Sequence, residues 1–305
     1  MSAPHAFGRA ARFAVLSPPV VFLALFFLAP FLFVARISLS QSTRAQPPYA
    51  PQYEQGSGLE GLRAVLEGLN FENYATILSD DLYLSAFLTA LRIAATSTFL
   101  LLLIAYPIAY AMARARPALR PLLLALMIVP FWTSFLIRIY AWIGILKPEG
   151  LLNQALLALG LIDAPLEILN TEIAIYIGIV YAYLPFMVLP IYAVLVAQSH
   201  DLLEAAADLG CPPWKSFWLV TVPLSAPGVA AGCLLVFIPC VGEFVIPDLL
   251  GGSETLMIGR QLWSEFFGNR DWPTASAIAV ILVIILLIPF LILRRLEARG
   301  EEALK

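Results

Sequence analysis

The chain has 305 residues, of which 61% are hydrophobic and 13% charged, and its formal net charge is −3. Its mean hydropathy is +0.86, and several apolar runs exceed the roughly 18 residues that a membrane-spanning helix needs, which excludes a soluble globular protein. The composition therefore predicts an all-α polytopic membrane protein, for which we expect membrane lipid and no nucleic acid as a partner.

Residues for catalysis or metal binding are scarce. His5 and His200 are the only histidines, and Cys211, Cys233 and Cys240 have no CxxC spacing, so we interpret the cysteines as packing residues. No GxxxxGK[ST] phosphate loop occurs. We therefore expect a chain that is not an enzyme, has no catalytic residue and binds no metal or cofactor of its own.

The N-terminal region predicts one span followed by a long polar segment. Residues 1–12 precede a first transmembrane helix at residues 13–35, whose apolar core at 13–34 is too long for a cleaved signal peptide. Residues 36–85 form the polar segment. Within it, leucines at helical spacing indicate a short amphipathic helix: Leu59, Leu62, Leu66 and Leu69.

Five further apolar runs predict a total of six spans. They lie in a core region, residues 86–293, at 87–112, 119–146, 172–196, 228–250 and 275–293, and a charged tail follows at 294–305. Several of these runs contain proline: Pro107, Pro130, Pro185, Pro190, Pro239, Pro247 and Pro289. Broken helices are tolerated beside a water-lined pathway, but the same prolines can simply shape the packing, and both interpretations stay open.

The distribution of Lys and Arg predicts the orientation. Ten lie in the termini and in two loops: Arg9, Arg12, Arg114, Arg116, Arg120, Lys215, Arg294, Arg295, Arg299 and Lys305. Six lie in the longer segments on the other side: Arg36, Arg44, Arg63, Lys147, Arg260 and Arg270. The positive-inside rule therefore places both termini and the loop at 200–223 in the cytoplasm, and the segment at 36–85 outside.

The polar loop at residues 200–223 separates two apolar runs. Its first half predicts a short helix, with Asp201 and Glu204 at the spacing of a capping box and Gly210 at its end. A second short helix is expected to start at Pro213 and to expose an apolar face made of Trp214, Phe217, Trp218 and Val220. Two amphipathic helices joined by a tight turn indicate a docking element for another protein.

This loop resembles the EAA loop of the membrane subunits of binding-protein-dependent ABC importers. Glu204, Ala205 and Ala206 are followed after three residues by Gly210, and after nine more by Val220-Thr221-Val222-Pro223, where the family more often has Ile and Leu at the two valine positions. The resemblance implies that a separate ATPase docks here. The residues implied in coupling are Glu204, Ala205, Ala206, Asp208, Gly210 and Pro223.

Four charges fall inside predicted spans, and each is costly there: Arg92, Arg138, Glu243 and Asp248. At ~1.5 Å per residue, Arg138 and Glu243 both lie roughly 25 Å from the cytoplasmic ends of their spans. One interpretation is an ion pair between Arg138 and Glu243. The other is that Glu243 and Asp248 face a pathway and neutralise a cationic solute.

Aromatic residues on the third and fourth spans favour the second interpretation, because a ring face attracts an ammonium group. The candidates for the pathway are Trp132, Tyr140, Tyr183 and Phe186. Some of them, Tyr140 in particular, can equally belong to the aromatic belt at the membrane surface.

Four stretches, residues 130–146, 176–193, 236–252 and 257–273, resemble the putrescine/spermidine branch of this importer family, and most closely the putrescine-type permease. The resemblance implies the type I ABC importer permease fold in a bacterial inner membrane. It also implies four kinds of partner: a second related permease subunit, two copies of a cytoplasmic ATPase that holds ATP and Mg, a periplasmic polyamine-binding protein, and lipid.

Three alternatives remain from the sequence. The importer substrate can be another organic cation or an opine. A proton-coupled secondary transporter would use Glu243 and Asp248 as a proton relay, but it leaves the loop at 200–223 unexplained. A membrane scaffold or receptor leaves the charged, proline-containing spans unexplained.

Overall fold

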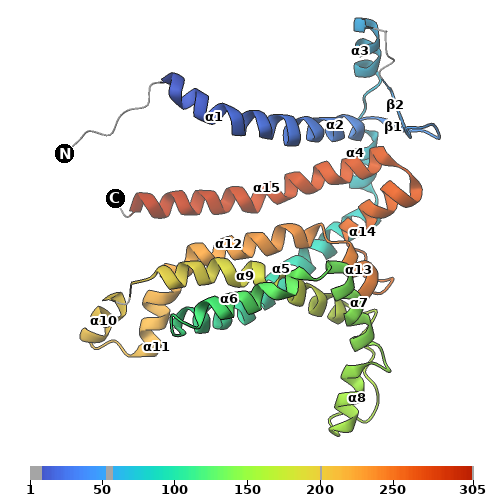
Figure 1. Cartoon of the computed structure of the whole chain (residues 1–305). Helices are drawn as coiled ribbons and strands as arrows, with labels where there is room; N and C mark the ends of the chain where they lie inside the picture. The colour runs from blue at the N-terminus through green and yellow to red at the C-terminus, as the bar shows by residue number, and fades with distance from the viewer. Residues whose placement is uncertain (1–8, 53–57, 200, 304–305) are drawn as a thin grey trace. The chain divides into compact units, whose positions relative to one another are not determined.

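The computed structural model describes residues 9–52, 58–199 and 201–303, and the chain divides into two compact units. The first unit takes the chain up to Asp80 and adds Leu262–Val283, and the second takes Asp81–Gln261 and the chain from Ile284 onward. Apart from one two-stranded ribbon, the regular elements in the described part are helical (Figure 1). This confirms the predicted all-α membrane architecture.

The first unit is built on an apolar N-terminal helix. Its elements are α1 (Arg9–Leu23), η1 (Ala24–Leu28), α2 (Ala29–Ser38), β1 (Gln41–Ser42), β2 (Tyr49–Ala50), α3 (Gly58–Glu67), α4 (Glu72–Ser79), η4 (Ser264–Asn269) and the first part of α15 (Trp272–Ala303). Helix α3 confirms the short helix predicted from the leucine spacing. Hydrogen bonds fix α4, since the amide of Asn73 donates to the carbonyl oxygens of Ser38 and Ser40 at 2.9 and 2.8 Å.

The second unit contains the core of the membrane region. Its elements are α5 (Asp81–Arg114), α6 (Arg120–Ile128), η2 (Val129–Trp132), α7 (Phe135–Leu146), α8 (Leu151–Ala158), α9 (Glu172–Ala197), α10 (Asp201–Asp208), α11 (Pro213–Ser216), η3 (Phe217–Thr221), α12 (Val222–Val241), α13 (Val245–Leu250), most of α14 (Ile258–Trp263) and the rest of α15. Helices α5, α9 and α12 pack on one another and supply the buried core.

Five helices in the described part are long and apolar enough to cross a membrane. They are Phe13–Ser38, Asp81–Arg114, Glu172–Ala197, Pro213–Val241 and Trp272–Leu291. The first, second, third and last of these five helices agree with predicted spans to within a few residues at most ends, because apolar composition alone sets these lengths. Helices α5, α9 and α15 continue through Pro107, Pro185, Pro190 and Pro289.

Two predicted spans are wrong in detail. The third, predicted as one helix over 119–146, is a pair of helical segments, Arg120–Trp132 and Phe135–Ala158, bent by 88°. Pro130 lies in the 3-10 turn at this bend, where the backbone leaves the helical conformation at Thr133. The fifth, predicted over 228–250, starts at Pro213 and ends at Val241, and α13 follows as a separate helix.

Close contact between α9 and α12 depends on small residues. A Cβ added at Gly228 would lie 2.8 Å from the carbonyl oxygen of Pro190 and 2.9 Å from a methyl carbon of Val194. The first of these atoms belongs to the backbone of α9 and cannot rotate away. Glycine at this position therefore sets the spacing of the two helices, as small residues do at many helix contacts in membranes.

We predict that Gly228→Val weakens this contact by about 1–3 kcal/mol, the usual cost of overpacking, and lowers the midpoint of thermal aggregation of the detergent-purified protein. Ala226→Val is the matched control, because Ala226 is exposed on the same helix. Equal midpoints for the two variants would contradict the proposed spacing role of Gly228.

Candidate functional site

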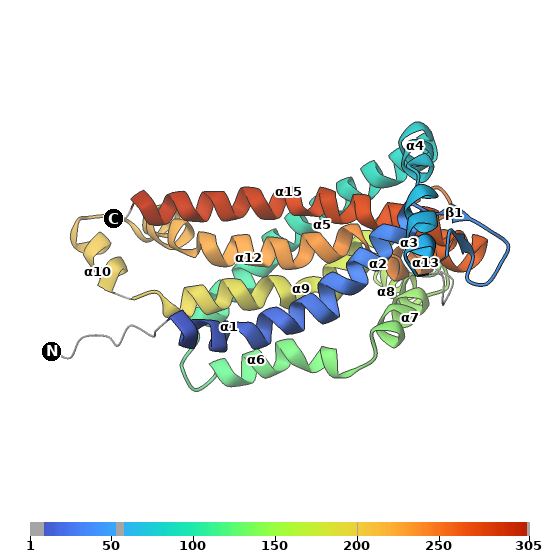
Figure 2. The same ribbon diagram turned by 90° about the horizontal axis from the view of Figure 1, so that it is seen from above.

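The predicted site residues lie at the two ends of the helix bundle in the second unit. Helices α10 and α11 lie at one end of α9 and α12, and α7 and α13 lie at the other (Figures 1 and 2). The EAA-like loop is therefore well separated from the break between α12 and α13 that contains Glu243. We describe the loop first.

The end of α10 is closed by a specific turn. Gly210 has φ +78°, and its N–H donates to the carbonyl oxygen of Ala207 at 2.8 Å, while the N–H of Cys211 donates to Ala206 at 2.9 Å. This pair of bonds is a Schellman motif, which ends a helix with a residue in the left-handed region. The predicted role of Gly210 as the helix stop is confirmed. At the other end of α10, the N–H of Asp201 donates to the hydroxyl of Ser199 at 3.2 Å.

Most side chains of helix α10 are exposed on the surface of this chain. Glu204, Ala205 and Asp208 are exposed and Ala206 is half-buried, so α10 has no buried residue. At its end, Leu209 is 88% exposed, and Trp214 and Trp218 on the next turns are also exposed. An apolar surface of this kind on a short polar helix is typical of a docking element.

The second helix of the loop differs from the prediction. Helix α11 begins at Pro213 as expected, but it runs through η3 into α12, so that Pro213–Val241 is one long helix and Pro223 lies within it. Phe217 does not share the exposed face of Trp214 and Trp218. Its ring packs edge-on against Tyr106 and Tyr110 of α5, at 5.9 and 5.3 Å. The loop is thus anchored to the bundle through Phe217.

The carboxylate of Glu243 lies between α12 and α13 and is only 8% exposed. Its Oε1 accepts hydrogen bonds from the backbone N–H groups of Phe244, Val245 and Ile246, at 3.1, 3.0 and 3.4 Å. Its Oε2 accepts the hydroxyl of Tyr183 on α9 at 2.6 Å. The charge is therefore stabilised by the first turn of α13 and by one phenol.

Two of the four predicted aromatic residues join this group. The ring of Phe186 lies 6.0 Å from that of Tyr183 and 5.3 Å from that of Phe131, which belongs to η2. Trp132 and Tyr140 are 83% and 57% exposed in this chain, and the structure brings neither of them to Glu243. The rings of Tyr183, Phe186 and Phe131 thus form a continuous row that starts at the carboxylate.

The predicted ion pair between Arg138 and Glu243 is not formed in this structure. The guanidinium of Arg138 lies over the rings of Phe131 and Phe135, at 5.0 and 5.8 Å, and its buried Nε has no hydrogen-bond partner among the described residues. The reason is the bend at Pro130, since the depth assigned to Arg138 assumed one straight helix. Arg138 and Glu243 lie at opposite ends of the aromatic row instead.

The other predicted intramembrane charges have partners that sequence reasoning missed. The carboxylate of Asp248 pairs with Nε of Arg260 at 3.1 Å and ties α13 to α14. Arg92 on α5 pairs with Glu172 at the start of α9. Opposite charge is the only sequence signal for these pairs, and it is weak because Arg92 and Glu172 are 80 positions apart.

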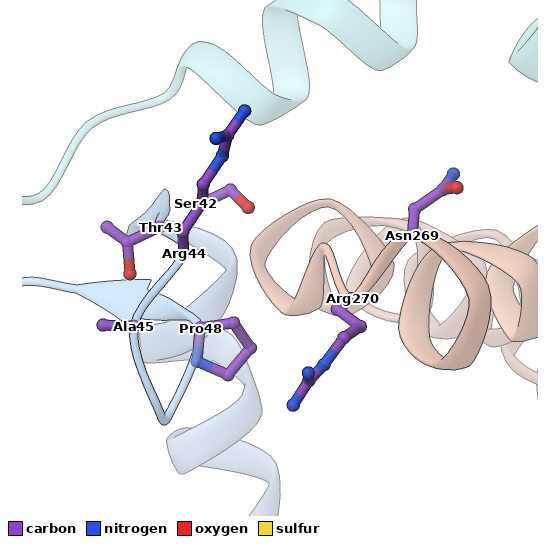
Figure 3. Close-up of a pocket in the computed structure, with 7 residues that line it drawn as sticks. All are labelled: Ser42, Thr43, Arg44, Ala45, Pro48, Asn269 and Arg270. Atoms are coloured by element: carbon purple, nitrogen blue, oxygen red, sulfur yellow. The ribbon is translucent and has the colours of Figure 1, made fainter.

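Other parts of the described chain offer weaker sites. A hollow of about 490 Å³ in the first unit is lined by the β1–β2 hairpin and the end of η4. Figure 3 shows the guanidinium groups of Arg44 and Arg270 directed away from each other, so no donors converge on one point. In the described residues, no group of at least three His, Cys, Asp or Glu is placed to hold a metal ion.

Solved structures share this fold. A chain of the bacterial alginate ABC transporter, crystallised in complex with a periplasmic protein bound to an alginate pentasaccharide, has a TM-score of 0.67 and 15% identity, with 94% of this chain and 93% of that chain covered. A chain of the MetNI methionine ABC transporter has a TM-score of 0.55 and 16% identity, with 70% and 94% covered. The chain therefore has the fold of ABC importer permeases.

Curated relatives are more similar in sequence. The spermidine/putrescine transport system permease protein PotB of Haemophilus influenzae is 43% identical over 218 residues, which cover 72% of this chain and 76% of the relative. The protein of the same name from Escherichia coli K12 is 43% identical over 215 residues, covering 70% and 78%. A family model for the inner membrane component of binding-protein-dependent transport systems matches residues 101–300. The chain belongs to this family of inner-membrane transport components, as the EAA-like loop indicated.

Proposed function

We propose that this chain is a membrane-spanning subunit of an ATP-driven importer that carries polyamines, putrescine and spermidine, into the cytoplasm. The chain is not itself an enzyme, as its relatives are transport permeases. The proposal is carried by the 43% identity to permeases for these two substrates, over more than two thirds of the chain. Family membership also argues against the proton-coupled transporter and scaffold alternatives.

The proposed assembly contains three kinds of partner. Two copies of a cytoplasmic ATPase, which hold ATP and Mg, would dock on α10, and a second related permease subunit would complete the channel. A periplasmic protein would deliver the polyamine. The exposed surface of α10 with Leu209 and Trp214 supports the docking step, because an apolar surface at the tip of a polar loop is unusual without a partner.

The proposed orientation puts α10 and both termini in the cytoplasm. It is supported by the ten Lys and Arg residues on that side, against six on the other. The break at Glu243, at the opposite end of α12, then lies nearer to the periplasm. A polyamine delivered from the periplasm would meet this break before it meets the cytoplasmic half of the bundle.

Glu243 is the proposed binding residue for one ammonium group of the polyamine. Its carboxylate has four hydrogen-bond donors but no cation as partner among the described residues. Hydrogen bonds stabilise the charge without neutralising it, so an ammonium group would add a favourable Coulombic interaction. The adjacent rings of Tyr183 and Phe186 would contact the methylene chain or attract a second ammonium.

The function predicts ATPase-dependent uptake. Cells that express the complete transporter should accumulate labelled putrescine and spermidine, and loss of this chain or of its partner ATPase should reduce uptake to background while the proton gradient is intact. Uptake that persists without the ATPase would contradict the proposal. Uptake of an unrelated organic cation in preference to both polyamines would contradict the substrate assignment alone.

The left-handed conformation of Gly210 allows a test of whether the EAA-like loop couples the ATPase to transport. An added Cβ at Gly210 meets nothing within 4 Å, so a substitution acts through its φ of +78°. A β-branched residue costs roughly 1–2 kcal/mol there, whereas Asn tolerates the left-handed region. We predict that Gly210→Val lowers uptake about tenfold or more, and that Gly210→Asn retains most of it.

Both Gly210 variants should still insert in the membrane, because α10 has no buried residue. ATP hydrolysis by the purified complex should become independent of substrate, or the ATPase should dissociate, in Gly210→Val only. Wild-type coupling in Gly210→Val would show that the turn does not position α10 for docking.

The variant Glu243→Gln tests whether the charge of Glu243 contributes to polyamine binding. The glutamine side chain has the same shape and can still accept the N–H groups of α13, so the transporter should assemble. We predict that its KM for polyamine uptake rises about tenfold, since a charge-assisted contact contributes roughly 1.5–3 kcal/mol.

Asp248→Asn is the matched control, because it removes an equal charge from the exposed, Arg260-paired carboxylate on α13. An unchanged KM in Glu243→Gln would show that Glu243 caps α13 but does not bind the polyamine through its charge. An equal rise in both variants would indicate a general field effect and not a binding contact.

A further inference from the structure

A hollow of about 330 Å³ lies at the base of the EAA-like loop, entirely within the second unit. Three segments line it, namely the end of α5, helix α10, and the start of the long helix that begins at α11. Its lining includes Tyr110, Arg114, Leu203, Ala207, Ser216 and Phe217. At roughly 30 Å³ for each water, the space suits a polar group much larger than one water molecule.

Ser216 is the first observation that points to a ligand. The residue is only 6% exposed, and its buried Oγ has no hydrogen-bond partner among the described residues. A buried hydroxyl without a partner is destabilising, so a group in the hollow that accepts or donates a hydrogen bond would remove this cost. The ring of the next residue, Phe217, packs edge-on against Tyr110 of α5.

Arg114 gives the site its charge. Its guanidinium lies over the ring of Tyr110, at 5.3 Å from the ring centroid, and both residues line the hollow. The described lining contains no Asp or Glu, and Lys215 lies next to Ser216 in the chain. Guanidinium and hydroxyl donors in one hollow favour an anion, and the planar guanidinium group matches the geometry of a phosphate.

The surroundings indicate where the phosphate comes from. Most of the lining is apolar, and Leu203, Ala207, Pro213 and Phe217 contribute to it. Trp218 is exposed beside it, and tryptophan is enriched where protein meets the membrane surface. Arg116 lies in the loop after Arg114, and Arg120 begins α6; basic groups at the end of a span attract anionic phospholipid.

We propose that this hollow binds a phosphate group, and that its source is the headgroup of an anionic phospholipid. A bound headgroup would bridge Arg114 of α5 and Ser216 of α11, and so hold the base of the proposed ATPase-docking loop against the bundle. The lipid source depends on the proposed cytoplasmic placement of the loop, whereas the anion site depends only on the residues that line it.

Native mass spectrometry of the purified transporter, with this chain at full length, would test the site. The detergent-solubilised complex is titrated with phosphatidylglycerol, with phosphatidylcholine and with inorganic phosphate. We expect retained phosphatidylglycerol on the wild type, about tenfold weaker binding in Arg114→Gln, and a smaller loss of about two- to fivefold in Ser216→Ala. Phosphatidylcholine should not compete.

Arg116→Gln is the matched control, because it removes the same charge two residues further along the chain, outside the hollow. Equal losses in Arg114→Gln and Arg116→Gln would overturn the site in favour of diffuse attraction. Binding of inorganic phosphate with the same dependence on Arg114 and Ser216, but none of the lipid, would support the anion site and overturn the lipid source.

Ser216→Ala keeps the test valid if Arg114→Gln fails to assemble, since it removes only one hydroxyl. Lipid binding is measured without transport, so a failure of polyamine uptake would not change this result. Conversely, loss of the lipid in a transporter that still imports polyamines would leave the proposed function intact.

Discussion

The arrangement around the break between helices α12 and α13 depends on the carboxylate of Glu243. Where α12 ends at Val241 and α13 starts at Val245, the first N–H groups of the new helix have no helical partner. In apolar surroundings each unsatisfied group costs several kcal/mol, so a break here needs an acceptor. One oxygen of Glu243 supplies it for three N–H groups, and the other oxygen binds Tyr183 and holds α9 to the same point.

The helix that ends at this break begins at the other end of the bundle. Pro213–Val241 has 29 residues, so at ~1.5 Å per residue it is roughly 43 Å long and connects the EAA-like loop directly to Glu243. Its contact with α9 is tight at Gly228, which limits independent sliding of the two helices. A force applied to α11 by a docked ATPase would therefore reach the Glu243 group through one continuous element and its close neighbour.

Sequence reasoning succeeded where the determining chemistry is local. The apolar runs predicted most spans, and the turn at Gly210 followed from the Gly-Cys-Pro-Pro sequence, because the left-handed residue and the prolines act on their own backbone. Hydropathy did not predict the 88° bend near Pro130 or the break at Gly242, because the mean apolarity of both segments stays high although Thr133 and Ser134 follow the bend and Glu243 follows the break. Several other helices pass through proline unbroken, so proline alone gives no reliable boundary.

At the candidate site too, the sequence predicted what depends on one residue but not what depends on distant partners. Glu243 was identifiable as a costly charge, but its partners were not, since three are backbone groups and Tyr183 is 60 positions away. The ion pair expected with Arg138 is not formed in this structure, and this changes the energetics of the proposed polyamine binding at Glu243. In the part of the chain that the structure describes, no cation pairs with Glu243, and the guanidinium of Arg138 lies over the rings of Phe131 and Phe135. A polyamine could therefore approach Glu243 without first breaking an ion pair. Arg138 also covers the far end of the aromatic row, so the ring faces of Tyr183 and Phe186 are the part of the row left for an ammonium or its methylene chain.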